Sequence, residues 1–252
     1  MITRKSREQI ALMRKAGKVV AEMHEVCVRA AKPGATTADV DQAAREVLDL
    51  RGARSNFLGY GSPPFPGVIC ASPNEVIVHG IPSKHVVLHE GDILSIDCGA
   101  IIEGWHADAA ITVPVGEIDD ESKRLLEVTR ASLEAAIEHV TNADRLGDIG
   151  AAVEDVAERA GFSVVREYVG HGIGTAMHEE PQIPNYGPPG RGLKLKEGMV
   201  LAVEPMVNAG SAATELLADG WTVVTQDRRR SAHFEHTIAV SANGPEVLTL
   251  PW

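Results

Sequence analysis

The sequence places one aspartate in the middle of each of two apolar stretches. The segment "ILSIDCGAIIEGWHADAAITV" (residues 93–113) is typical of two strands joined by a short turn, with Asp97 in the first strand and Asp108 in the second. A buried strand accommodates a carboxylate only when another group compensates its charge. The fold must therefore bring a compensating group to these two acids.

The turn determines how the two acids face each other. If Ile101 pairs with Gly104 across a two-residue turn, Asp97 lies directly opposite Asp108, with Cβ atoms roughly 4.5–5.5 Å apart. Two ionised carboxylates at that separation repel each other, so we expect a shared proton or a cation between them. A solvated hairpin edge is disfavoured, because apolar runs of this kind are normally covered on both faces. The apolar neighbours are Ile93, Leu94, Ile96, Ile101 and Ile111.

Length and composition restrict the class of protein. The 252 residues, 44% hydrophobic and 23% charged, fit a globular chain of one large domain or two small ones. A net charge of −11 argues against nucleic-acid readout. Three cysteines without a CxxC spacing (Cys27, Cys70 and Cys98) indicate reduced thiols. With no signal peptide or membrane-spanning run, we expect a cytoplasmic protein without membrane contact.

Helix signals occur in two pairs. Ser6 and Gln9 have capping-box spacing at the start of a first helix, which "KPG" ends. A second helix is expected from Thr36 or Thr37 to Gly52, followed by Gly- and Pro-rich sequence and by strands.

The same order of elements then repeats. The segments "DDESKRLLEVTRASLEAAIEHV" and "LGDIGAAVEDVAERAG" predict two further helices, and sequence typical of strands follows to the end. We therefore expect an α+β fold of two related halves, approximately residues 1–116 and 117–252.

Acids recur at matching places in the two halves. "LHEGDILSID" aligns without a gap to "LKEGMVLAVE", which puts Asp97 and Glu204 at the same position of the repeat. "ADAAI" and "FEHTI" match in the same way, with Asp108 opposite Glu235. If an approximate two-fold axis relates the halves, all four carboxylates converge at that axis.

Four converging carboxylates carry about −4, which two divalent cations would neutralise. A proton-sharing pair would need only two acids. His171, between glycines in "VGHGIG", adds a neutral ligand, although a histidine alone is usually satisfied by ordinary contacts. Carboxylate-bridged metal pairs are a known hydrolytic arrangement, and oxygen-rich ligands with one imidazole suit Mn, Fe or Co as much as Zn.

The ordered set of Asp97, Asp108, His171, Glu204 and Glu235 resembles the metal-binding signature of the methionine aminopeptidases, which share the pita-bread fold. The likeness runs from "NEVIVHGIP" through "IDCGAIIEGWHAD", "GHGIG", "HEEPQIPNYG" and "EPMVNAG" to "FEHTI". No insert separates "HEEP" from "VEP", and no further domain is expected before the catalytic one, as in the type I form. The resemblance implies a single catalytic domain whose curved antiparallel sheet encloses a dinuclear metal site.

The resemblance also implies roles for these five residues. Asp97 would hold one divalent metal ion (Co, Mn, Fe or Zn), and His171 with Glu204 would hold the other. Asp108 and Glu235 would bridge the two ions. Glu204 would in addition take a proton from the attacking water.

Other matching positions imply contacts with substrate. His79 in "VHGIP" and His178 in "MHEEP" match family histidines that contact the scissile peptide. Without the resemblance, the sequence assigns no role to either histidine. The other histidines considered also have no assigned role: His85, His89, His106 and His236.

The polarizable sulfur of methionine makes favourable contacts with aromatic rings. The walls of a methionine pocket would be Tyr60, Phe65, Cys70, Met177 and Trp221, although each could equally be core. Phe57, Met177 and an expanded "GSPPFPG" depart from the bacterial pattern, so the shape of the pocket should differ.

The function implied is removal of the N-terminal methionine from nascent polypeptides when the second residue is small. Many bacterial relatives have lysines after "VNAG" for docking near the ribosomal exit tunnel, where this chain has "SAATELLADGW". The nearby basic clusters are "DRRR" and "GRGLKLK", so we expect ribosome engagement to be weaker or made differently. Nothing in the sequence requires more than a monomer.

Three alternatives use related chemistry. A proline-specific aminopeptidase or dipeptidase can use the same five ligands, but such relatives usually carry an extra N-terminal domain for which this chain has no room. A binding scaffold that has lost catalysis should show gaps in the ligand set. A metal-free, creatinase-like hydrolase would not need all five ligands.

Overall fold

The structure is a computed structural model that describes residues 2–251. Among these residues, no helix is long and apolar enough to cross a membrane. The helices are α1 (Arg7–Ala30), α2 (Thr37–Arg51), α3 (Asp120–Glu138) and α4 (Leu146–Arg159). The strands are β1 (Arg54–Ser55), β2 (Ile69–Pro73), β3 (Val76–Val78), β4 (Ile93–Ile102), β5 (Trp105–Pro114), β6 (Ser163–Val164), β7 (Gly170–Gly172), β8 (Glu179–Ile183), β9 (Val200–Val203), β10 (Met206–Asn208), β11 (Thr214–Leu216), β12 (Val223–Thr225), β13 (Ser231–His233), β14 (His236–Ser241) and β15 (Gly244–Val247).

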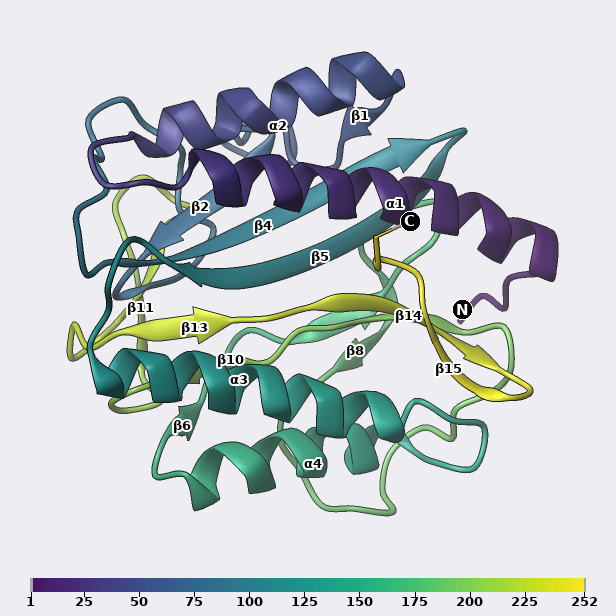
Figure 1. The fold of residues 1–252 in the computed structure, drawn as a ribbon. Helices are drawn as coiled ribbons and strands as arrows, with labels where there is room; N and C mark the ends of the chain where they lie inside the picture. The colour runs from purple at the N-terminus through teal and green to yellow at the C-terminus, as the bar shows by residue number, and fades with distance from the viewer. Residues whose placement is uncertain (1, 252) are drawn as a thin grey trace.

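Two helix pairs lie on the outside of antiparallel sheets (Figure 1). Helices α1 and α2 cover the sheet of order β1-β4-β2, to which β5 is added along β4. Helices α3 and α4 cover the other side, where the largest sheet has the order β15-β14-β9-β7-β8. The predicted α+β class and the repeated order of helices and strands are confirmed.

The helix boundaries follow local capping chemistry. Ser6 and Gln9 form the predicted capping box at the start of α1. Thr36, rather than Thr37, caps α2 by accepting a hydrogen bond from the backbone N–H of Asp39. Gly52 ends this helix in a left-handed conformation with φ 60°, which glycine adopts without steric cost.

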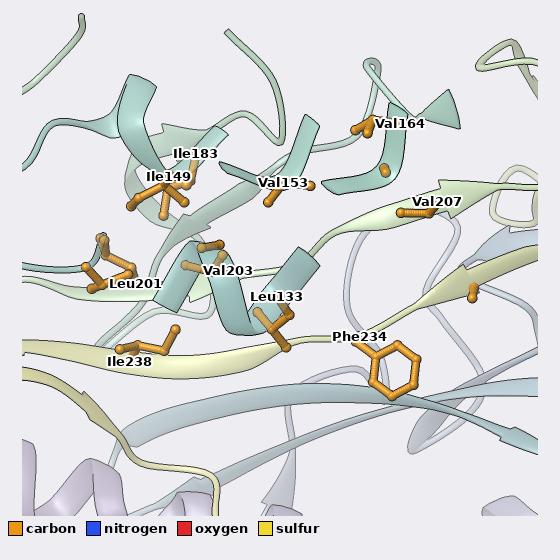
Figure 2. Close-up of a cluster of buried hydrophobic side chains, with 14 of the residues drawn as sticks. Leu133, Ile149, Val153, Val164, Ile183, Leu201, Val203, Val207, Phe234 and Ile238 are labelled. Carbon is orange, nitrogen blue, oxygen red and sulfur yellow. The ribbon is translucent and has the colours of Figure 1, made fainter. Parts of the chain in front are cut away.

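Each half has its own apolar core. Helices α1 and α2 pack on β2, β4 and β5, and this cluster contains Cys27 and Cys98, both fully buried. All three cysteines are free, as predicted. Figure 2 shows the core of the second half, where Leu133 of α3 and Ile149 and Val153 of α4 lie against strand residues such as Leu201. Burying aliphatic side chains of this size stabilises the fold by about 1.5–3 kcal/mol each.

The register of the β4–β5 hairpin differs from the prediction. Ile102 pairs with Trp105, so Asp97 lies opposite Ala110 and Asp108 lies opposite Gly99. The two aspartates are therefore diagonal neighbours on one face instead of a directly opposed pair. The cause is the turn at 103–104, where both residues have positive φ (51° and 81°), as a type I′ turn requires.

The other two predicted acids lie at strand ends. Glu204 directly follows β9, and Glu235 lies between β13 and β14. The backbone N–H of Glu235 donates to the carbonyl of Ala110, and the Thr237 hydroxyl bonds the backbone of Asp108. These bonds join β5 of the first half to β14 of the second, which brings the acids of both halves together.

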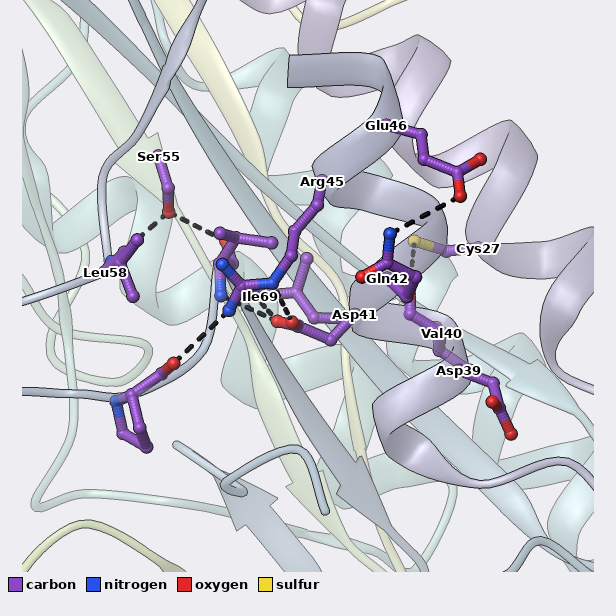
Figure 3. A network of polar contacts seen from close by, with 12 residues as sticks. Cys27, Asp39, Val40, Asp41, Gln42, Arg45, Glu46, Ser55, Leu58 and Ile69 are labelled. Atoms are coloured by element: carbon purple, nitrogen blue, oxygen red, sulfur yellow. Dashed lines mark hydrogen bonds and ion pairs between the residues drawn. The ribbon is translucent and has the colours of Figure 1, made fainter. Parts of the chain in front are cut away.

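A buried carboxylate anchors the segment that leads from α2 to β2 (Figure 3). Asp41 Oδ1 accepts from the backbone N–H groups of Val68 (2.6 Å) and Ile69 (3.2 Å). Its Oδ2 accepts from Arg45 Nε at 2.6 Å, and Arg45 also donates to the carbonyl of Pro66. This network fixes the backbone immediately before Cys70, one of the predicted pocket residues.

Candidate metal centre and substrate cavity

One cavity of about 170 Å³ collects every residue to which the sequence assigned a metal or substrate role. This volume is below the roughly 300–1,000 Å³ of pockets for drug-sized ligands, and it suits a single side chain. The lining residues are Phe57, Tyr60, Phe65, Cys70, His79, Asp97, Asp108, His171, Met177, His178, Glu204, Trp221 and Glu235.

The tightest group in the cavity consists of Asp108, His171 and Glu235. One ligand atom from each lies within 4.8 Å of the others, and the side chains are buried. This is the one group of at least three such residues at that spacing within residues 2–251. Asp97 and Glu204 line the same cavity without belonging to this group.

His171 is oriented so that its Nε2 points toward the acids. Nδ1 donates to the carbonyl of Gly172 at 2.9 Å, which leaves Nε2 with its lone pair, 3.6 Å from Glu204 Oε1. A side chain at Gly170 or Gly172 would collide with the carbonyl of Ala202 or of Glu180, respectively, at less than 2.5 Å. The two glycines therefore let neighbouring strands approach β7 closely.

The electrostatics of the acids require a compensating charge. Burial raises the pKa of Asp97 to about 7, and burial with repulsion between neighbouring acids raises the pKa values of Asp108, Glu204 and Glu235 well above normal. One oxygen each of Asp97, Asp108 and Glu235 is buried without a hydrogen-bond partner. Carboxylate oxygens without hydrogen bonds, beside an imidazole nitrogen with a free lone pair, are ligand atoms that divalent metal ions bind. These residues therefore fit a metal centre.

The two histidines predicted to contact substrate lie on the same cavity. His79 has a left-handed backbone with φ 59°, which is uncommon outside glycine and clusters at functional sites. His178 packs on the His171 ring, with centroids 4.4 Å apart, and its Nδ1 is hydrogen-bonded to the Tyr60 hydroxyl at 2.7 Å. Burial lowers the pKa of His79 to about 4 and also lowers that of His178, so both rings are neutral at pH 7.

An apolar pocket forms one side of the cavity. Phe57 and Trp221 each meet the ring of Phe65 edge to face, at centroid distances of 6.5 and 5.3 Å. Cys70 and Met177 complete the buried cluster. Trp221 Nε1 donates to the carbonyl of Pro63, so the proline-rich loop of the first half is tied to the second half. The structure thus brings the predicted pocket residues together on one cavity, and their contact with substrate stays a prediction.

Some neighbours of the site were not assigned from the sequence. Phe57 lines the cavity, although it was noted only as a departure from the family pattern. Asn56 is buried, donates to the carbonyl of Ala107 and bonds His106. His233 Nε2 lies 3.7 Å from Glu204 Oε2. The sequence signal for His233 was its place two residues before Glu235, a predicted metal ligand.

The four histidines without an assigned role lie outside the cavity lining. His85 and His89 are exposed. His106 Nδ1 bonds Asn56, and His236 Nδ1 bonds the Thr249 hydroxyl at 2.7 Å. None of them contributes to the group of residues that could hold a metal ion in the described part of the chain.

The fold and the site together define a metallopeptidase. Residues 11–242 match the model of metallopeptidase family M24, and the chain belongs to this family. It is 51% identical over 250 residues to a methionine aminopeptidase of Clostridium acetobutylicum and 51% identical over 249 residues to methionine aminopeptidase 1 of Bacillus subtilis, covering 99% of both chains in each pair.

Solved structures agree with this assignment. A methionine aminopeptidase from Thermotoga maritima superposes with a TM-score of 0.97 at 45% identity, covering 99% of this chain and 100% of that one. A prolidase from Pyrococcus furiosus superposes with a TM-score of 0.80 at 20% identity, covering 99% of this chain and 66% of that one, and shows the fold alone. The predicted pita-bread fold is confirmed.

We predict that metal binding releases protons near neutral pH. The acids with raised pKa values hold protons in chelator-treated protein, and a divalent cation must displace them. His171 releases none there, because burial lowers its pKa to about 4. Titration calorimetry with Mn²⁺ at pH 6.5, in two buffers of different ionisation enthalpy, should show net release that declines above pH 7 as Asp97 ionises. Binding without proton release at pH 6.5 would contradict the raised pKa values.

Proposed function

We propose that this chain is a metal-dependent aminopeptidase that removes the N-terminal methionine of nascent proteins when the second residue is small. The observation that carries the proposal is one cavity in which a buried carboxylate–imidazole cluster adjoins an apolar, sulfur-lined pocket. The methionine aminopeptidases that are 51% identical over the whole chain support the same activity.

The five acidic and imidazole side chains have the donor chemistry for two divalent ions. We assign Asp97 to one ion, His171 and Glu204 to the other, and Asp108 and Glu235 to both. When bound, such ions lower the pKa of a water molecule and polarise a carbonyl. Mn, Fe, Co and Zn all suit this ligand set.

The remaining steps belong to side chains around the cluster. The Glu204 carboxylate takes a proton from the water that attacks the scissile peptide. His79 and His178, as neutral rings, donate hydrogen bonds to that peptide. For His178 the donor would be Nε2–H, in the tautomer whose Nδ1 accepts from the Tyr60 hydroxyl.

The substrate side chain would occupy the apolar pocket. A methionine thioether gains from contact with aromatic edges, which Phe57, Phe65 and Trp221 offer. Tyr60 and His178 line the cavity beside the cluster and are held together by their hydrogen bond. We infer that this pair restricts the second residue of the substrate to a small side chain.

We further propose that residues 1–252 act as one catalytic unit, because both halves contribute acids to the cluster. The expected partners are the N-termini of nascent chains, which places the protein in the cytoplasm, as a monomer. The "DRRR" segment is largely neutralised: Arg228 pairs with Glu215, Arg229 with Glu121, and Arg230 with Asp119. Contact with the ribosome near the exit tunnel would therefore be weak or would use other residues.

A proline-specific aminopeptidase or dipeptidase is the competing function. A prolidase shares the fold at 20% identity, which does not carry its substrate over to this chain. A peptide whose second residue is proline and whose first is alanine distinguishes the two functions.

We predict that chelator-treated protein regains peptide cleavage when Mn²⁺, Co²⁺, Fe²⁺ or Zn²⁺ is restored. Met-Ala-Ser should release methionine, because its first side chain fills the pocket and its second is small. Met-Lys-Ser and Ala-Pro-Ser should remain intact over the same period. Liquid chromatography of the products measures each peptide. Cleavage of Ala-Pro-Ser would favour the proline-specific function, and no cleavage by folded, metal-loaded protein would favour a binding scaffold.

Two substitutions should separate metal binding from substrate contact. Asp97→Asn keeps the shape but removes a charge, so it should weaken binding of one ion and lower kcat.

His178→Ala should lower kcat by about 10²–10³-fold with metal affinity unchanged, since it removes a hydrogen-bond donor. Calorimetry and steady-state kinetics measure both effects. Wild-type turnover in Asp97→Asn, or metal loss in His178→Ala, would overturn the assigned roles.

A further inference from the structure

His233 is a buried histidine directly behind the metal-binding acids. It ends β13 and is 2% exposed. Its backbone N–H donates to the Thr112 hydroxyl, and its carbonyl accepts from the same hydroxyl, both at 2.8 Å. The backbone of His233 is therefore fixed to β5, and its ring has little freedom to leave the site.

The ring nitrogen Nε2 of His233 is buried without a hydrogen-bond partner. A buried polar atom of this kind destabilises the folded state unless it has a hydrogen-bond partner. Within residues 2–251, the only carboxylate within 4.0 Å of it belongs to Glu204, whose Oε2 lies at 3.7 Å. A shift of about 0.7 Å would shorten this distance to a normal hydrogen bond of about 3.0 Å.

The Glu204 carboxylate lies between two imidazoles with different requirements. His171 Nε2 faces Oε1 at 3.6 Å with a lone pair, because its Nδ1 carries the proton that bonds Gly172. A lone pair and an ionised carboxylate oxygen attract each other only through a proton or a metal ion between them. His233 Nε2 faces the other oxygen, Oε2, outside the cavity lining. On that side, a proton on His233 Nε2 would form a hydrogen bond to Glu204 Oε2.

We propose that His233 is a positioning residue whose Nε2–H donates to Glu204 Oε2 and holds Oε1 toward His171. The inference rests on the proposed function, in which Glu204 and His171 hold one divalent ion. Hydrogen bonds that orient a metal ligand in this way typically change metal affinity or activity by 10–100-fold when removed.

Three variants test the role of the donor. His233→Leu removes it, and His233→Gln restores an N–H donor on a flexible side chain. His236→Gln is the matched control, because His236 directly follows Glu235 in the chain but bonds Thr249 instead of an acid. We expect His233→Leu to bind Mn²⁺ about 10–100-fold more weakly in calorimetry of chelator-treated protein. His233→Gln should stay within about threefold of wild type, well below the 10–100-fold loss expected without a donor, and the control should match wild type.

Two results would overturn the proposal: wild-type affinity in His233→Leu, or a loss in His233→Gln as large as in His233→Leu. Circular dichroism shows whether each variant is folded. If wild-type protein itself binds no divalent metal, the proposed function fails instead, so the two failures are distinguishable.

A measurement on the unaltered chain avoids any folding defect in the variants. In ¹⁵N-histidine-labelled protein loaded with Zn²⁺, the His233 ring should show a protonated Nε2, and the His171 ring an unprotonated, metal-bound one. The His233→Gln spectrum assigns the signal. An unprotonated Nε2 on His233 in the metal-loaded protein would overturn the positioning role, because the ring would then either bind the metal or lack the proposed hydrogen bond.

Discussion

Repulsion among four buried carboxylates is the constraint on which the site depends. Asp97 and Asp108 come from the first half, and Glu204 and Glu235 come from the second. Burial raises the pKa values of all four acids, and repulsion from neighbouring acids raises those of Asp108, Glu204 and Glu235 further, so each half alone would carry an uncompensated pair of acids. In the proposed metal centre, divalent cations would remove this cost, and the same negative charges would give the centre its affinity for metal.

The fold brings the two halves together around this site. Each helix pair covers the outer side of its own sheet (Figure 1), and residues of both halves line the cavity. Hydrogen bonds of the Thr237 hydroxyl with the backbone of Asp108, and of the Glu235 backbone N–H with the carbonyl of Ala110, fix the relative position of the halves at the acids. The contact between Trp221 and Pro63 does the same at the apolar pocket.

Much of this arrangement could be predicted from the sequence, because capping boxes, helix periodicity and a repeated acid are local signals. The hairpin register could not, since it depends on which residues of the turn adopt positive φ, and residues 103 and 104 do so. His79 and His178 carry no local pattern, so only the family resemblance pointed to them. His233 was missed because its partner, Glu204, is distant in sequence and meets it only through the pairing of β10 with β13.

Anomalous X-ray diffraction from crystals grown with Mn²⁺ tests the central claim most directly, because it locates metal independently of activity. The account predicts two anomalous peaks, about 3.5–4 Å apart, among Asp97, Asp108, His171, Glu204 and Glu235. The opposite result is an electron-density map without a peak in this cavity, in which Asp97 and Asp108 share a proton through a short hydrogen bond. That outcome would mean that protonation, and not metal, compensates the buried acids.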